Sequence, residues 1–303
     1  MIKRIIKSIV YRLINSGKIP LSDAAYLKIL FYLYEGYMLN LNKPQSLKEK
    51  MQWLKLHDRN PLYTQLVDKY EVRKYIANEI GEKHLVKNYG VWDHFDEIDF
   101  KKLPEKFVLK CTHNSSAPII CKDISTFDYN LAKRIIEKQL SNNYFWSGRE
   151  WPYLNVKSRI IAEELLENND GTPLADYKFY CYGGEPRYFM YSLGEAEHKV
   201  RNHKFDMKCN SIDYLFKEKT NLDISEIKLP SNLYEMIDLV KTLCKGLCAD
   251  SQHVRLDFYN VNGKIYFGEV TYYSNSGFIN IDSKEYSDWL AGLIDIGKVY
   301  DAK

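Results

Sequence analysis

Hydrophobic residues in the first hundred positions recur at the spacing of helices rather than strands. Ser46 and Glu49 have the spacing of a capping box, and Pro61 stands where helices often begin. The pattern predicts helices over 22–36, 46–57 and 61–81. We therefore expect residues 1–100 to form a mainly helical N-terminal region that packs on the core of the protein.

Residues 1–16 carry an apolar stripe opposite a basic face. The stripe consists of Ile2, Ile5, Ile6, Ile9, Val10, Leu13 and Ile14. The basic face carries Lys3, Arg4, Lys7 and Arg12, and no acidic residue precedes Asp23. A helix of this kind either lies on an anionic membrane surface or docks on its own domain. Both interpretations stay open, and docking is the commoner use of such a stripe.

After Lys106 the hydrophobic spacing changes to that of short strands joined by turns. The pattern predicts strands over 107–112, 118–121, 159–166, 174–182, 185–193 and 199–206. It predicts helices over 127–140, 233–247 and 286–296. Because short turns join neighbouring strands in antiparallel pairs, we expect an α+β fold with mainly antiparallel sheets.

The segment Val254–Thr271 carries a strong hairpin signal, since two alternating apolar runs flank Asn262–Gly263. A two-residue turn would place Asp257 opposite Gly268 and turn Glu269 to the other face. A three-residue bulged turn would place Asp257 and Glu269 on one face. We expect the bulged turn, because a cross-strand carboxylate pair is a simple way to hold Mg²⁺. An ordinary hairpin with a polar outer face would show the same pattern.

Composition narrows the class of protein. The chain of 303 residues is 45% hydrophobic and 27% charged, which is ordinary for a globular protein. A net charge of +3, without a dense basic face, argues against nucleic-acid binding. None of the six cysteines forms a CxxC pair, the first apolar stretch is not a secretory signal, and no apolar run is long enough to span a membrane. We expect a cytoplasmic protein.

Other polar residues stand at the ends of predicted strands. Lys110 precedes a small polar loop, and Glu163 and Glu164 end the strand RIIAEELL. Lys178 alternates with aromatic residues and shares a face with Asp176. Taken alone, Lys110 is more typical of a solvated strand end, paired acids at a strand end are common, and Lys178 is as compatible with the wet side of a sheet as with a site. Their order, followed by Arg-x-Asp and Glu in the hairpin, is that of a Mg·ATP site: two lysines for phosphates, a hinge for adenine and two carboxylates for the metal.

The motifs together resemble the ATP-grasp superfamily and, within it, the TupA-like family named for teichuronopeptide biosynthesis. The matching stretches are PQSLKEKMQWL, DKYEVRKY, YGVW, LPEKFVLKCTHNSS, RIIAEELL, DYKFYCYGGEP and VRLDFYNVNGKIYFGEVTYYSNSGF, within residues 20–295. The resemblance implies a small ATP-binding subdomain over 101–165 and a C-terminal subdomain over 166–303, which enclose the nucleotide between antiparallel sheets.

The resemblance also implies roles for individual residues. The implied nucleotide-binding residues are Lys110, Lys178, Ser115 and Ser116 of the phosphate-covering loop, and Glu163, Glu164 and Leu165 of the hinge. The implied Mg²⁺ ligands are Asp257 and Glu269. Many members have Glu-x-Asn on the second metal strand, whereas Glu269 is followed by Val270 and Thr271 here. Asn275 is therefore our candidate for the missing amide ligand.

The activity implied by the resemblance is ligation with ATP and Mg²⁺. An amide would form between a uronic-acid carboxylate of a surface-glycan or glycolipid precursor and an amino acid or other amine, through an acyl phosphate. Arg255 would neutralise the acyl phosphate together with Lys178, and His113, Arg187 and Arg201 are candidates for acceptor contacts. A lipid-linked precursor would explain a contact of residues 1–16 with the inner face of the membrane. A glycosyltransferase, a sugar kinase and a non-catalytic scaffold are the alternatives.

Overall fold

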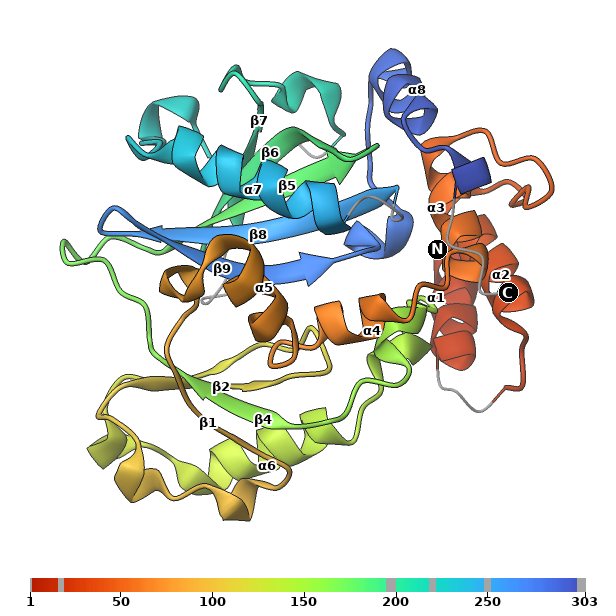
Figure 1. Cartoon of the computed structure of the whole chain (residues 1–303). Coiled ribbons are helices and arrows are strands. Elements are labelled where there is room, and N and C mark those ends of the chain that lie inside the picture. Colours follow the sequence, from red (N-terminus) through yellow and green to blue (C-terminus); the bar gives the residue numbers. More distant parts are fainter. Residues whose placement is uncertain (1, 16–18, 195–199, 218–221, 248–251, 299–303) are drawn as a thin grey trace.

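Two antiparallel sheets lie one above the other in Figure 1 and define the architecture of the protein. This computed structural model describes all residues except 1, 16–18, 195–199, 218–221, 248–251 and 299–303, and for residues 2–6 it describes the backbone alone. The sheets are accompanied by helices, so the expected α+β class with antiparallel sheets is confirmed.

The smaller sheet has four strands in the order β1-β4-β2-β3. Its strands are β1 (Asn88–Trp92), β2 (Phe107–Cys111), β3 (Ile119–Cys121) and β4 (Ile160–Glu163). Helix α6 (Tyr129–Leu140) packs on β2 and buries Ala132 and Ile136. The sequence pattern did not predict β1, which lies before residue 100 and pairs with β4. The small sheet therefore takes one strand from the region that we expected to be helical.

The larger sheet has five strands in the order β7-β6-β5-β8-β9. They are β5 (Ala175–Tyr182), β6 (Glu185–Leu193), β7 (Arg201–Asp206), β8 (His253–Val261) and β9 (Lys264–Thr271). Helix α7 (Leu233–Leu247) crosses this sheet in Figure 1 and contacts β6 and β8, and α8 (Lys284–Gly292) packs on the N-terminal region. Apolar side chains of the hairpin, among them Leu256 and Phe258, are fully buried in this core.

The N-terminal helices begin where their capping residues predict. In α2 (Asp23–Glu35) the side chain of Ser22 accepts from the backbone N–H of Ala25. In α3 (Leu47–His57) Ser46 and Glu49 form the expected capping box. The single helix predicted over 61–81 is wrong: the chain forms α4 (Leu62–Val67) and α5 (Val72–Ile80). Asp68 separates them, because its carboxylate accepts hydrogen bonds from the backbone N–H groups of Tyr70 and Glu71.

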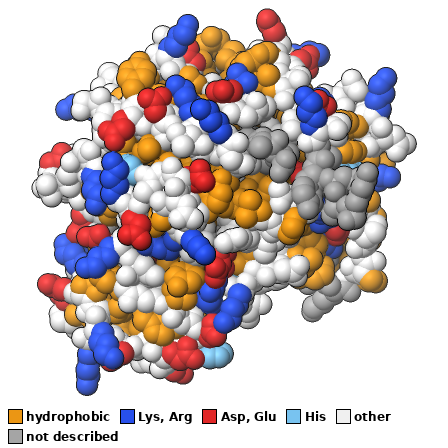
Figure 2. Space-filling view, viewed as in Figure 1, with side chains coloured by type: hydrophobic (Ala, Val, Ile, Leu, Met, Phe, Trp, Pro, Cys, Tyr) orange, Lys and Arg blue, Asp and Glu red, His pale blue; other side chains and the backbone are white. Residues whose placement is uncertain are grey.

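Helix α1 (Ile2–Asn15) packs on α2. Ile14 is buried and Val10 packs against the same small core, whereas Ile9 is 52% exposed and Leu13 is 50% exposed. The apolar stripe is therefore used in part for docking and in part left at the surface. None of the described helices is long and apolar enough to cross a bilayer. On the face seen in Figure 2, acidic and basic side chains are interspersed.

The β8–β9 hairpin brings its two carboxylates together by a route that we did not expect. The turn has two residues, Asn262 and Gly263, with φ of 52° and 81°, so the predicted three-residue turn is wrong. The register shifts farther along instead: Asp257 pairs with Glu269, the next pair is Phe258 with Phe267, and Gly268 is the extra residue. A Cβ atom at Gly268 would lie 3.0 Å from the carbonyl oxygen of Asp257, so glycine keeps this bulge close to its partner strand.

Candidate active site

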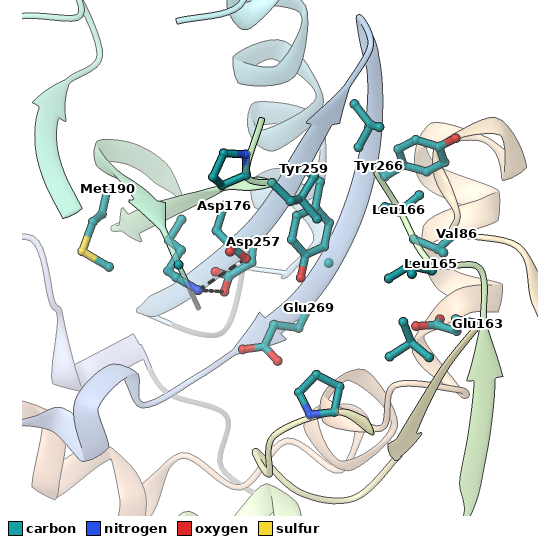
Figure 3. A pocket seen from close by; sticks show the side chains of 18 of the residues that line it. Val86, Glu163, Leu165, Leu166, Asp176, Met190, Asp257, Tyr259, Tyr266 and Glu269 are labelled. Atoms are coloured by element: carbon teal, nitrogen blue, oxygen red, sulfur yellow. Dashed lines mark hydrogen bonds and ion pairs between the residues drawn. The ribbon is translucent and has the colours of Figure 1, made fainter. Parts of the chain in front are cut away.

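A cleft of about 1720 Å³ separates the two sheets and is lined by residues of both. The smaller sheet and the loops that follow its strands contribute Lys110, Ser115, Ser116, Glu163, Glu164 and Leu165. The larger sheet contributes Lys178, Arg255, Asp257 and Glu269. Asn275 follows β9 and also lines it. Most of the residues predicted for the site therefore share one space, part of which Figure 3 shows.

Charged residues form a row across three neighbouring strands. Lys178 of β5 pairs in register with Asp257 of β8, which pairs with Glu269 of β9. The Lys178 ammonium lies 3.3 Å from a carboxylate oxygen of Asp257. The Arg255 guanidinium binds both oxygens of Asp257, at 2.7 and 2.8 Å, and one oxygen of Glu269 at 2.7 Å. These four residues converge as the sequence motifs predict.

The cations around Glu269 keep its carboxylate ionised. Burial acts to raise the pKa of Glu269, but Lys69, Arg255 and Lys178 together outweigh it and lower the pKa to about 2. Lys69 lies 3.7 Å from Glu269 and also lines the cleft. Lys69 is part of the DKYEVRKY motif, but nothing local in the sequence indicates that the segment between α4 and α5 reaches the hairpin.

On the opposite wall, Lys110 and Glu163 bind each other. The Lys110 ammonium lies 2.8 Å from one oxygen of Glu163, and Arg73 lies 3.2 Å from the other. Burial acts to lower the pKa of Lys110, but the attraction of Glu163 outweighs it and raises the pKa. Lys110 therefore stays charged at the cleft surface, where it can bind phosphate oxygens. The carboxylate of Glu163 is shared by two cations, whereas Glu164 follows the strand and is partly exposed.

The loop 113–117 is held from below by polar contacts. The Asn114 side chain donates to the carbonyl of Gln139 and accepts from the N–H of Ser116, so Ser115 and Ser116 face the cleft. His113 does not: it is 3% exposed, its ring contacts the carbonyl of Asn142, and burial lowers its pKa. His113 therefore lies outside the lining of the cleft, and its ring contacts the segment after α6 instead.

Arg187 and Arg201 are not brought to the cleft either. The Arg187 side chain donates to the carbonyl of Tyr182 and stacks over Trp289. Arg201 pairs with Glu226 at 2.9 Å on the surface. Neither lines the cavities found among the described residues.

A smaller cavity of about 300 Å³ adjoins the cleft. Ser115, Arg255, Glu269 and Asn275 line both spaces. Glu150 also lines the smaller cavity. No sequence pattern indicates this residue, because a single acid within an aromatic stretch carries no motif.

The floor of this smaller cavity is a strained turn fixed by a buried lysine. Asn275 and Ser276 both have a φ of 51°, and Gly277 follows with a φ of 77°. The ammonium of Lys55, which is 1% exposed, donates to the carbonyl and hydroxyl oxygens of Ser276 and to the carbonyl of Gly148. Three hydrogen bonds to one buried cation hold a backbone conformation that is otherwise unfavourable. Lys55 stands between Leu54 and Leu56 in the sequence, and that apolar context was the only signal of its burial.

The donor set on β8 and β9 suits Mg²⁺ with a bound phosphate. Among the described residues, no group of three or more His, Cys, Asp or Glu side chains could hold a metal ion alone. Mg²⁺ commonly uses one or two protein carboxylates and takes its other ligands from water and substrate phosphates. Asp257 and Glu269 provide two such carboxylates on paired positions, and both now contact Arg255. Asn275 lies at the junction of the two cavities, and its role as a ligand stays a prediction.

The chain is similar to known proteins in sequence and in fold. The sequence model described as TupA-like ATPgrasp matches residues 49–295. No curated protein matches the chain. Among the solved structures that are similar in fold is D-alanine–D-alanine ligase from Bacillus anthracis complexed with ATP, with 16% identity, a TM-score of 0.40 and coverage of 69% of this chain and 55% of that chain. Another is L-amino acid ligase from Bacillus licheniformis, with 14% identity, a TM-score of 0.45 and coverage of 84% of this chain and 56% of that chain. The chain spans little more than half the length of either.

Proposed function

Because the chain belongs to the TupA-like ATP-grasp family, we propose that it is an ATP- and Mg²⁺-dependent carboxylate–amine ligase. The carboxylate is that of a uronic acid in a surface-glycan precursor, and the amine is an amino acid or a related compound. The observation that carries the proposal is the row of Lys178, Asp257 and Glu269 with Arg255 beside it. Fixed charges of both signs in a cleft of about 1720 Å³ suit phosphoryl transfer.

The reaction has two steps. A carboxylate oxygen of the uronic acid attacks the γ-phosphorus of ATP, the bond from that phosphorus to the β-phosphate oxygen breaks, and ADP leaves. The amine nitrogen then attacks the acyl carbon, the C–N bond forms, and phosphate leaves with the electron pair of the C–O bond. Lys110 and Lys178 would bind phosphate oxygens from the two walls, and Arg255 would neutralise the acyl phosphate. Mg²⁺ held by Asp257 and Glu269 would offset negative charge on the phosphates.

The proposal is tested by assaying the full chain with Mg·ATP, D-glucuronate or D-galacturonate, and each of the twenty amino acids. We expect ADP release that requires both the uronate and an amine, and a product whose mass has gained one amino-acid residue. A product that gains only phosphate would instead identify a sugar kinase. Consumption of a nucleotide sugar without ADP release would identify a glycosyltransferase. Failure of Mg·AMP-PNP to raise the thermal unfolding temperature would favour a non-catalytic scaffold.

We further propose that α1 contacts an anionic membrane, which would bring the enzyme to a lipid-linked precursor. Ile9 and Leu13 are about half exposed, and Lys7 and Arg12 lie on the same short helix. Vesicle flotation of the full chain tests this: with anionic vesicles, replacing Ile9 and Leu13 by Ser should lower the bound fraction several-fold. The matched control replaces the exposed Tyr214 and Tyr234 by Ser and should float like the wild type. Equal flotation of both variants would exclude a role for α1.

A further inference from the structure

The smaller cavity lies at the Arg255 end of the hairpin, away from the hinge. The hinge lies near the other end of the hairpin. In the segment after the hinge, the backbone N–H of Asn169 donates to the side-chain oxygen of Asn262, in the hairpin turn, at 2.9 Å. In Figure 3, Leu165 of the hinge lies near Tyr266, and Asp257 lies on the other side of Tyr259, farther from the hinge. Arg255 is two residues farther along β8 and lines both cavities. A nucleotide with its base at the proposed hinge would therefore direct its terminal phosphate toward the smaller cavity.

Size and charge indicate which substrate each space can take. The large cleft of about 1720 Å³ extends along β6 and β7 to Asn202 and Lys204, and it has room for a carboxylate-bearing glycan beside a nucleotide. Lys204 is 6% exposed and lies 3.5 Å from Asp213. The smaller cavity has only about 300 Å³, which is at the lower limit for small-molecule sites. Its aromatic walls are formed by Tyr11, Tyr26, Tyr34, Tyr144, Tyr153 and Tyr273. Aromatic faces and a carboxylate attract an ammonium group rather than an anion.

Glu150 is the buried acid of this cavity. Its side chain is 3% exposed and accepts a hydrogen bond from the hydroxyl of Ser276, which in turn accepts from Lys55 at 2.9 Å. Burial, together with the nearby carboxylate of Glu269, raises the pKa of Glu150 to about 7. Lys55, Ser276 and Arg255 act in the opposite direction but do not outweigh burial. The titratable hydroxyl groups of Tyr144, Tyr153 and Tyr273 also interact electrostatically with Glu150. A carboxylate in such a place can exchange a proton near neutral pH.

We propose that the smaller cavity binds the amine co-substrate, and that the carboxylate of Glu150 receives its ammonium group and takes one proton from it. This inference rests on the proposed ligase function. Loss of the proton frees the nitrogen lone pair, which attacks the acyl carbon. The C–N bond forms, the C–O bond to phosphate breaks, and the second nitrogen proton leaves with the phosphate as hydrogen phosphate. Lys55 and Ser276 act through Glu150 and are positioning residues.

Binding is tested apart from turnover. The twenty amino acids serve as probes in calorimetric titrations of the full chain with Mg·AMP-PNP. We expect at least one of them to bind the wild type and to bind Glu150→Gln about 10-fold or more weakly, because a charge-assisted hydrogen bond is lost. Glu137→Gln is the matched control, since Glu137 is an ion-paired glutamate on the exposed side of α6. It should bind like the wild type.

A second variant leaves the buried charges in place. Ser147 lines the smaller cavity and is exposed at its edge, so Ser147→Trp should fill the space without disturbing Glu150. We expect this variant to lose amino-acid binding and keep Mg·AMP-PNP binding. If no amino acid binds the wild type, or if both variants bind it normally, the inference is overturned. If Ser147→Trp loses amino-acid binding and Glu150→Gln keeps it, the role of Glu150 is overturned. Binding that depends on Glu150 without any ADP release would retain the pocket and remove the ligase function.

Hydroxylamine separates proton transfer from a structural role. It is a neutral nucleophile at pH 7.5 and needs no base before it attacks an acyl phosphate. With the amino acid that binds, Glu150→Gln should lower the rate of ADP release by about 10²–10⁴-fold. With hydroxylamine as the probe, the same variant should work within about threefold of the wild type. Equal loss with both nucleophiles would show that Glu150 only supports the fold of the cavity.

Discussion

Replacement of Glu269 by Gln should lower the rate of ADP release by about 10³-fold or more, equivalent to about 4 kcal/mol in the barrier. The variant removes one of the two carboxylates that face each other across the β8–β9 ladder, and with it the charge available to a bound cation. The rate is measured at saturating Mg·ATP with the uronate and amine that the wild type uses. Glu269 is 30% exposed at its side chain, so we expect the variant to stay folded.

Glu226→Gln is the matched control for this prediction. Glu226 also accepts from an arginine, Arg201, but at the surface and away from the cleft. It should leave the rate within about twofold of the wild type. A rate of Glu269→Gln close to that of the wild type would remove the assignment of the hairpin to metal binding.

The Glu269→Gln variant should also change how the free energy of unfolding depends on pH. The pKa of Glu269 is about 2 in the folded protein, below the ordinary value of 4.5. Its ionised form therefore contributes stability above pH 4.5, and this contribution is lost as the pH falls toward 2. The difference in free energy of unfolding between the wild type and Glu269→Gln should shrink over that range in urea titrations.

Replacement of Lys55 by Met should lower the free energy of unfolding by about 3–5 kcal/mol. The variant removes the lysine cation beside Glu150 and the donor to the carbonyl of Gly148. The carbonyl of Ser276 loses one of its two donors and keeps the side-chain amide of Gln52. Against a total stability of about 5–15 kcal/mol for a typical protein, this is a large loss. Urea unfolding at pH 7.5 measures it.

Two further variants show whether charge pairing is the cause. The double variant Lys55→Met with Glu150→Gln should recover part of the loss, because no unpaired buried charge remains. Lys102→Met is the control, since Lys102 is 83% exposed and pairs with Asp99 only at the surface. It should change the free energy of unfolding by less than about 1 kcal/mol. A similarly small change in Lys55→Met would show that the buried ammonium is not needed to hold the turn at Ser276.

Predictions that depend on local chemistry were the most successful. Ser46 and Glu49 cap α3 as a capping box requires, and Asn262–Gly263 forms the turn of the hairpin. Errors arose where one residue overrides a periodic pattern. The carboxylate of Asp68 ends the helical run after α4, and the bulge at Gly268 corrects a register that the two-residue turn alone would set wrongly. The amphipathic stripe of α1 favoured docking over a membrane surface, and in the structure Ile14 is docked while Ile9 and Leu13 are half exposed.

The sequence by itself determined the antiparallel α+β class, most helix and strand positions, and the conjunction of Lys110, Lys178, Asp257 and Glu269 that identifies the family. These depend on short-range propensity and on the order of motifs. Only the tertiary structure decided that Lys69 reaches Glu269, that His113 lies under its loop, and that Lys55 and Glu150 meet through Ser276 beside Arg255. Contacts between residues so distant in the chain follow from how the helices pack against the sheets, and no local spacing encodes that packing.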